Sequence, residues 1–138
     1  MAVNQKNCAC GSKKGYLLCC APYHKGKAVP TAALLLISRF SAYAMNLPHF
    51  IIETTHPDNP EYQRDLQEWE KRISSFSSSH FFEGVEILDM ENKREEATIR
   101  FIAYLKKGGG SATFIENSFF VRQEGRWLYR NGTIESRL

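Results

Sequence analysis

The stretch Arg94–Arg130, REEATIRFIAYLKKGGGSATFIENSFFVRQEGRWLYR, decides the fold class of this chain. Apolar and polar residues alternate along it with a period of two, which is typical of strands with one buried face. Together with the residues just before it, the stretch predicts four strands, at 81–90, 94–107, 112–122 and 126–130. The breaks between them are short and contain Asn or Gly, as hairpin turns do. We therefore expect an antiparallel meander.

The residues ahead of these strands have helical spacing instead. Thr31 is a good N-cap, and apolar side chains then recur at three- and four-residue steps, at Ala33, Leu36, Ile37, Phe40, Tyr43, Ala44 and Leu47. Pro48 predicts a shorter helix over about residues 48–55, which ends before Pro57. A third helix is predicted with Asn59 as its cap and Pro60 at its first position. Its apolar stripe is Tyr62, Leu66, Trp69, Ile73 and Phe76, and the serine-rich residues 74–79 end it.

Three helices followed by four strands predict an α+β fold, with the helices packed on one face of a curved antiparallel four-stranded sheet. A long bent sheet wrapped around the first helix makes a cone with an open end. The segment Gly26–Pro30 reads as a linker in front of this part. We therefore expect two units, a small module at 1–27 and a cone domain at 28–138.

The small module carries all four cysteines of the chain, in the pattern Cys8-x-Cys10-x8-Cys19-Cys20. Four thiolates are a ligand set that suits tetrahedral Zn²⁺, and a module of this size needs the metal to fold. A redox C-x-x-C motif is absent, and the spacing matches neither common ferredoxin pattern. The pattern predicts one structural zinc per chain. His24 is an alternative to Cys20 as fourth ligand, because adjacent cysteines on one metal are geometrically tight.

Composition supports reduced thiols rather than two disulfides. The chain of 138 residues is 43% hydrophobic and 24% charged, which is ordinary for a globular protein. No run approaches the roughly 20 apolar residues of a membrane span, and no secretion signal is visible. We expect a cytoplasmic protein without a membrane contact. In the reducing cytoplasm, cysteine clusters bind metal more often than they form disulfides.

Charge is unevenly distributed along the chain. Residues 1–30 contain five lysines, at positions 6, 13, 14, 25 and 27, and no acidic residue, whereas the remainder has 15 acidic and 13 basic side chains. The cysteine module is thus basic, and its charge is suited to an acidic protein surface or, with weaker support, to nucleic acid. Solubility of a tiny polar module is the plainer explanation.

The sequence of the module resembles the SEC-C motif, a short zinc-binding element also found at the C-terminus of the preprotein translocase ATPase SecA. The resemblance lies in CACGS at 8–12, Tyr16 and CCAPY at 19–23. It implies that the four cysteines bind zinc, and it implies protein partners for the module. Leu17 and Leu18 stand where the motif usually has lysines, so we expect them to pack the module onto the rest of the chain.

The order of elements resembles the nuclear transport factor 2-like (NTF2-like) cone fold. The local sequence is similar to that of the bacterial YchJ family, in which a SEC-C motif precedes one such domain. The similar segments are SRFSAY at 38–43, THP at 55–57, GVEI at 84–87, ENS at 116–118 and FVRQEGRW at 120–127. The resemblance implies this architecture but no particular activity.

Five residues are candidates for a site in the cone: Arg39, Tyr43, His56, Glu116 and Ser118. Arg39 is expected to pair with Glu116, either as a buried structural ion pair or around an anionic ligand. No acid and base are brought together by the sequence itself, so no catalytic residue is assigned. The sequence favours a non-catalytic binding or adaptor protein with a basic zinc module on a cone scaffold. The alternative is a binder of an anionic small molecule, or an enzyme, in which the zinc is purely structural.

Overall fold

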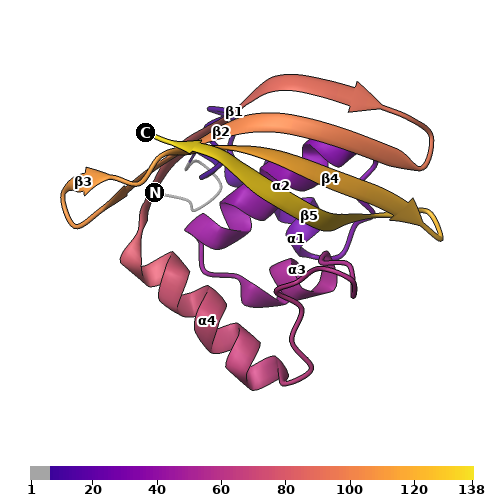
Figure 1. Ribbon diagram of the computed structural model, residues 1–138, viewed down its shortest axis with the longest axis horizontal. Coiled ribbons are helices and arrows are strands. Elements are labelled where there is room, and N and C mark those ends of the chain that lie inside the picture. The colour runs from indigo at the N-terminus through magenta and orange to yellow at the C-terminus, as the bar shows by residue number, and fades with distance from the viewer. Residues whose placement is uncertain (1–6) are drawn as a thin grey trace.

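The computed structural model describes residues 7–138, and its largest element is one curved antiparallel sheet (Figure 1). The strand order is β1-β2-β4-β5, and the two-residue strand β3 pairs with the end of β2. The bounds are β1 Phe81–Asn92, β2 Glu96–Lys107, β3 Gly110–Ser111, β4 Phe114–Gln123 and β5 Arg126–Arg137. The predicted α+β class and the meander are therefore confirmed. The last strand is longer than predicted, because its pairing with β4 continues as far as Phe114 opposite Arg137.

Helix α2, Ala32–Ala44, lies in the concave side of this sheet and contacts both edge strands, β1 and β5. The predicted cap is confirmed, since the Thr31 hydroxyl accepts a hydrogen bond from the Leu34 amide at 3.1 Å. Leu35 and Ala42 are fully buried, and so are polar positions such as Ser38 and Ser41. A helix that is buried almost all round must be covered on both sides. The sheet covers one side, and the cysteine module covers part of the other.

Helices α3, Pro48–Glu53, and α4, Leu66–Ser79, pack below α2 in Figure 1. The predicted cap of α4 is wrong. The Asp65 carboxylate accepts from the Glu68 amide and starts the helix, whereas Asn59 closes a separate turn by accepting from the Glu61 amide. The predicted end is confirmed, since the helix ends at Ser79, the last of the serine-rich residues.

The core lies between the sheet and the helices. Its buried side chains include Leu35, Ile51, Ile99, Leu105 and Phe120. Burial of an apolar side chain of this size stabilises the fold by about 1.5–3 kcal/mol. The linker is held to the last strand, because the Trp127 indole N–H donates to the Pro30 carbonyl at 3.3 Å. Within residues 7–138, none of the helices has the length and apolar character needed to cross a membrane.

Candidate functional site

The four cysteine sulfurs form a tight cluster. Cys8, Cys10 and Cys20 are buried, Cys19 is half-buried, and all four sulfur atoms lie within 4.8 Å of one another. The Sγ atoms of Cys10 and Cys19 are 3.6 Å apart, and those of Cys19 and Cys20 are 3.9 Å apart. Tetrahedral Zn²⁺ with bonds of about 2.3 Å separates its sulfur ligands by roughly 3.8 Å. The cluster can therefore hold a metal ion with little rearrangement.

Backbone turns bring the cysteines together. The Cys8 amide donates to the Lys14 carbonyl at 2.7 Å, which folds the first pair back on itself. Gly11 sits in this turn with φ at +88°, a conformation that favours glycine. The 3₁₀ turn Tyr16–Leu18 and the helical turn α1, Ala21–His24, meet at Cys19 and Cys20. Adjacent cysteines reach one cluster because the chain changes direction between these two turns.

The thiols perturb one another strongly. The hydrogen bond with the Cys20 thiol lowers the pKa of Cys10 to about 4. The same hydrogen bond raises the pKa of Cys20, and burial raises the pKa of Cys19. One thiolate is thus stabilised by protonated neighbours. Four thiolates together need a bound cation to balance their charge, which is the role a divalent metal has in such sites.

His24 lies outside the metal cluster and joins the cysteine module to the cone. Its Nε2 lies 2.8 Å from the Ser38 carbonyl oxygen, which only accepts, so Nε2–H is the donor. Nδ1 then accepts from the Tyr16 hydroxyl at 2.7 Å. Burial lowers the pKa of His24, which favours this neutral tautomer, and the ring edge packs on Phe50 at 4.8 Å between centroids. Cys20, not His24, is the fourth member of the cluster.

The expected role of the two leucines is wrong. Leu17 is 39% exposed and Leu18 is 87% exposed, so neither packs on the cone. The module is docked instead by His24 and by Ile37 of α2, which packs against the cysteines. The Gly11 turn also lies close to β1, because a Cβ placed on Gly11 would be 3.7 Å from the Gly84 Cα.

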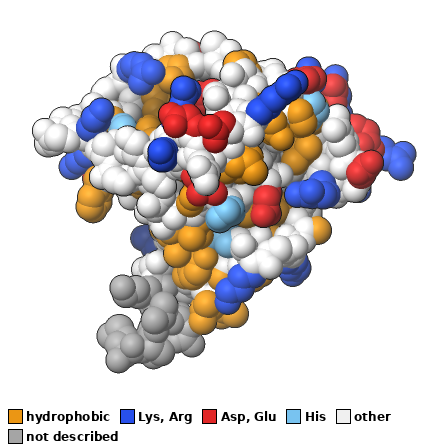
Figure 2. Space-filling view, turned by 90° about the horizontal axis from the view of Figure 1, so that it is seen from below, with side chains coloured by type: hydrophobic (Ala, Val, Ile, Leu, Met, Phe, Trp, Pro, Cys, Tyr) orange, Lys and Arg blue, Asp and Glu red, His pale blue; other side chains and the backbone are white. Residues whose placement is uncertain are grey.

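The described lysines of the module are exposed, as are these leucines. Lys13, Lys14, Lys25 and Lys27 are all on the surface, and none makes an ion pair within the described part of the chain. Lys6 belongs to residues 1–6, which are outside the described range. On the face in Figure 2, basic and acidic side chains are interspersed with hydrophobic ones, so that face is not of a single charge.

A cavity of about 500 Å³ lies between the sheet, α2 and α4. Three of its lining residues are arginines, of which Arg39 is 7% exposed and Arg72 and Arg137 are on the surface. Its walls are mostly apolar, with Leu36, Phe40, Trp69, Ile73, Phe76, Phe82, Val85, Phe101, Ala103, Leu105, Phe114, Phe120 and Ile134. The remaining lining residues are Tyr43, Glu61, Glu116 and Tyr129. The predicted candidates Arg39, Tyr43 and Glu116 are thus brought together.

The expected ion pair between Arg39 and Glu116 is wrong, because Tyr129 stands between them. The Arg39 guanidinium carbon lies 4.6 Å from the centre of the Tyr129 ring, a cation–π distance. The Tyr129 hydroxyl donates to Glu116 Oε2 at 3.0 Å. Burial raises the pKa of Glu116 and of Tyr129, against the opposing influence of Arg39. Burial also raises the pKa of Tyr43, so its hydroxyl stays protonated.

Two predicted candidates do not line the cavity. The Ser118 hydroxyl is buried and donates to the Ile99 carbonyl at 2.9 Å, so it ties β4 to β2. His56 is buried beside β5, where its Nδ1 accepts from the Asp58 amide at 3.0 Å. Both have structural contacts of the ordinary kind. The sequence did not single out Tyr129 as a site residue, because its position in a strand alternation indicates only an inward side chain.

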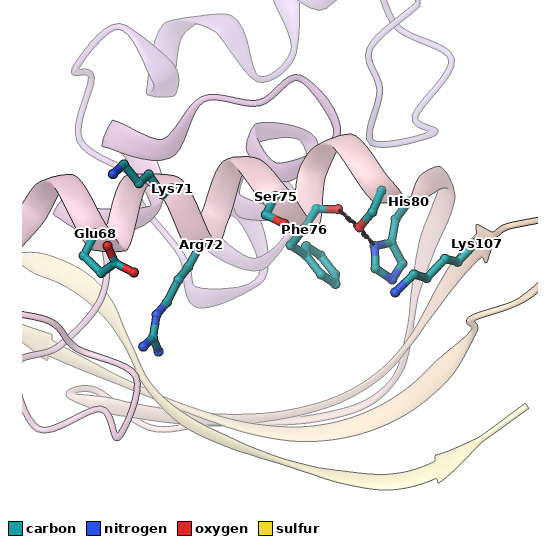
Figure 3. Close-up of a pocket in the computed structure, with 8 residues that line it drawn as sticks. Glu68, Lys71, Arg72, Ser75, Phe76, His80 and Lys107 are labelled. Atoms are coloured by element: carbon teal, nitrogen blue, oxygen red, sulfur yellow. Dashed lines mark hydrogen bonds between the residues drawn. The ribbon is translucent and has the colours of Figure 1, made fainter.

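A second, open hollow lies along α4 and reaches Lys107 of β2. Figure 3 shows the Arg72 side chain extending from the helix toward the sheet, with His80 and Lys107 at the other end. Arg72 and Phe76 line both this hollow and the cavity, so they form the boundary between them. The His80 Nδ1 is already engaged by the Ser79 hydroxyl at 2.9 Å.

Comparison with known proteins places this architecture in a family. Residues 31–132 match the family model described as the YchJ middle NTF2-like domain. A UPF0225 protein of Xanthomonas oryzae pv. oryzae is 33% identical over 124 residues, which cover 88% of this chain and 90% of that protein. The chain spans most of that relative.

Solved structures of similar proteins have the same architecture. A SEC-C motif containing protein from Rhodopseudomonas palustris has a TM-score of 0.79 at 28% identity, covering 95% of this chain and all of that one. A SEC-C motif containing protein from Psychrobacter arcticus has a TM-score of 0.75 at 23% identity, covering 100% of this chain and 88% of that one, which shows a common fold. With its cysteine cluster ahead of an NTF2-like cone, the chain belongs to the YchJ family.

Proposed function

We propose that Cys8, Cys10, Cys19 and Cys20 bind one structural Zn²⁺ and that the ordered cysteine module contacts a protein partner, with the cone as its scaffold. The separation of the four sulfur atoms carries the proposal, since all lie within 4.8 Å of one another. An all-sulfur, tetrahedral set is the typical structural zinc site and offers no open position for catalysis. The 28% identical relative from Rhodopseudomonas palustris is a SEC-C motif containing protein, which further supports metal binding.

The partner surface we propose is centred on Leu18, the most exposed large apolar side chain of the module. Lys13, Lys14 and Lys25 supply positive charge on the same small module and have no acidic partner among residues 7–138. An exposed leucine on a module with exposed lysines suits a protein segment that carries both apolar and acidic side chains. A cytoplasmic location belongs to the same proposal, because the site needs reduced thiols.

Metal analysis of the purified protein tests the first half. We expect about one zinc per chain in the wild type and a clear loss of zinc in Cys8→Ser and Cys20→Ser. His24→Gln is the matched control, because His24 lies outside the cluster and this variant should keep its metal. A zinc-free wild type, or an absorption band of bound iron, would refute the zinc site.

Partner capture tests the second half. Wild type and Leu18→Glu are compared as baits, with Leu88→Glu on β1 as control because Leu88 is also an exposed leucine, at 40%. We expect proteins that bind wild type and Leu88→Glu but not Leu18→Glu. Identical captured proteins for all three baits would rule out the Leu18 surface. Capture of RNA or DNA alone, released by moderate salt, would favour nucleic acid over a protein partner.

A further inference from the structure

We propose that the cone cavity binds a small organic acid with an apolar body, whose carboxylate is held by Arg39 inside the cone. The apolar body would lie among the aromatic side chains of the wall. This inference does not depend on the metal site, because the cavity is lined by residues of α2, α4 and the sheet, with Glu61 of the loop before α4, and by none of the cysteines.

The dimensions of the cavity fit a small molecule. Its volume of about 500 Å³ is within the range of roughly 300–1,000 Å³ that is common for ligand pockets. Rings from α2, α4 and three strands form the wall, at Phe40, Phe76, Phe82, Phe101 and Phe114. A pocket of this kind supplies affinity through apolar contact and needs only a few polar groups to fix orientation.

The Arg39 guanidinium is a polar group whose well-formed hydrogen bonds to the protein are all on one side. Its Nη1 donates to the Ile51 carbonyl at 3.1 Å and to the hydroxyls of Thr54 and Thr55 at 2.8 and 3.0 Å. Its Nε and Nη2 make no hydrogen bond of ordinary geometry within residues 7–138, although the Tyr43 hydroxyl is close enough to the guanidinium to have its pKa lowered by that contact. Arg39 is only 7% exposed and lines the cavity. A largely buried guanidinium with unused donors is stabilised by an acceptor that enters the cavity.

The free edge of Arg39 has the geometry of a carboxylate site. Nε and Nη2 of a guanidinium present two parallel N–H groups, which match the two oxygens of a carboxylate. The same chain shows this pairing on its surface, where Arg100 donates from Nε and Nη2 to the two carboxylate oxygens of Glu135 at 2.7 and 2.9 Å. Among residues 7–138, neither of the two carboxylates that line the cavity, Glu61 and Glu116, forms an ion pair with Arg39, and Glu116 accepts from Tyr129 instead.

The surrounding charges favour a monoanion. The cavity is lined by three arginines and two glutamates, and one of those, Glu116, is kept from Arg39 by the Tyr129 ring. Arg72 and Arg137 are exposed lining residues, so they attract anions toward the cavity from solvent. One guanidinium edge serves two oxygens, whereas a phosphate would need further donors for its third oxygen.

The test uses benzoate and hexanoate as probes, with benzamide and hexanamide as uncharged analogues of the same shape. The chain has two tryptophans, which gives two indole N–H signals in a ¹H–¹⁵N NMR spectrum. Trp69 lines the cavity, and Trp127 is bonded to Pro30 away from it. We expect a saturable shift of the Trp69 signal with at least one acid, no matching shift of Trp127, and binding at least about tenfold weaker for the amide.

Two variants and one control locate the carboxylate. Arg39→Gln should weaken the acid by at least about tenfold. Ala103→Leu, which fills the cavity and leaves Arg39 in place, should abolish binding. Arg94→Gln is the control, because the Arg94 side chain is 92% exposed. A Trp69 signal unmoved by both acids, equal affinity for acid and amide, or unchanged binding in folded Arg39→Gln would overturn the proposal. If Arg39→Gln does not fold, Ala103→Leu and the amide comparison decide it.

Discussion

At the scale of single residues, Tyr129 changes the chemistry expected of the cone. The sequence indicates Arg39 and Glu116 as partners, and the structure places the Tyr129 ring against one and its hydroxyl on the other. A tyrosine can contact a cation through its face and an anion through its O–H at the same time. The pair is therefore linked through a neutral side chain, and Glu116 is left half-buried without a direct ion pair among residues 7–138.

Glu116→Gln tests the electrostatic cost of this arrangement. Because burial raises the pKa of Glu116, the folded state holds its proton more tightly than the unfolded state does. The wild type should lose stability as pH rises through that raised pKa, while Glu116→Gln, which can still accept from Tyr129, should not. We expect the melting temperature of the variant, relative to the wild type, to increase from about pH 4 to pH 8.

The control for this comparison is Glu91→Gln, which removes an exposed carboxylate at the end of β1. Its melting curve should follow the wild type across the same pH range. Parallel pH profiles for Glu116→Gln and the wild type would contradict a raised pKa and would mean that Glu116 is well solvated.

At the scale of elements, the sequence predicts whether a segment is a helix or a strand better than it predicts where that helix or strand starts and ends. Strands 94–107 and 112–122 show a period of two because one face of each is buried, and this signal is local. The start of α4 is not determined by a local signal in the same way. Asn59 and Pro60 resemble a helix start, but the Asn59 amide donates to the Arg130 carbonyl of β5 at 3.0 Å. A contact between residues so far apart in the chain overrides the local cap signal.

The sequence does not predict the extension of β5 through residues 131–137, for a related reason. Those residues are mostly exposed, so their alternation carries no hydrophobic signal. Their pairing with β4 includes register shifts next to Glu116 and Phe120, which no local pattern encodes. The cysteine cluster was easier to predict, because its four members are of one residue type and lie in one short segment. The docking role of His24 depends on Ser38, which only the folded chain brings near.

Gly132→Ala is a prediction for β5. A Cβ at position 132 would overlap the side chains of Glu116 and Tyr129, so the strand or the Tyr129–Glu116 hydrogen bond must shift. We expect a loss of roughly 1–3 kcal/mol in the free energy of unfolding, measured by chemical denaturation. Gly84→Ala in β1 is the matched control, because a Cβ there meets no atom within 4 Å. Equal stabilities of the two variants would show that the space beside Gly132 is not tightly filled.

At the scale of the whole molecule, the cysteine module is part of the packed structure rather than an appendage on a linker. Its cysteines pack on Ile37, its Gly11 turn lies near Gly84, and His24 joins Tyr16 to the backbone of α2. Its leucines and lysines are exposed and take no part in these contacts. The module is therefore docked on the cone and still has exposed side chains for the proposed partner.

His24→Ala tests this docking. The variant leaves the Ser38 carbonyl and the Tyr16 hydroxyl without their partner and removes the ring packed on Phe50. We expect a loss of roughly 1–3 kcal/mol in the free energy of unfolding, with the zinc content unchanged. His49→Ala, whose side chain is 79% exposed, should be neutral. Loss of zinc from His24→Ala without loss of stability would instead make His24 part of the metal site.

Helix α2 has a consequence for how the two proposed sites communicate. Ser38, which accepts from His24, and Arg39, which lines the cavity, are consecutive residues of this helix. The cysteine module and the cavity therefore both contact α2. Binding free energies are reciprocal. The factor by which bound zinc changes the affinity for the acid therefore equals the factor by which the bound acid changes the affinity for zinc. Titrating the acid at controlled free zinc would measure that factor from either side.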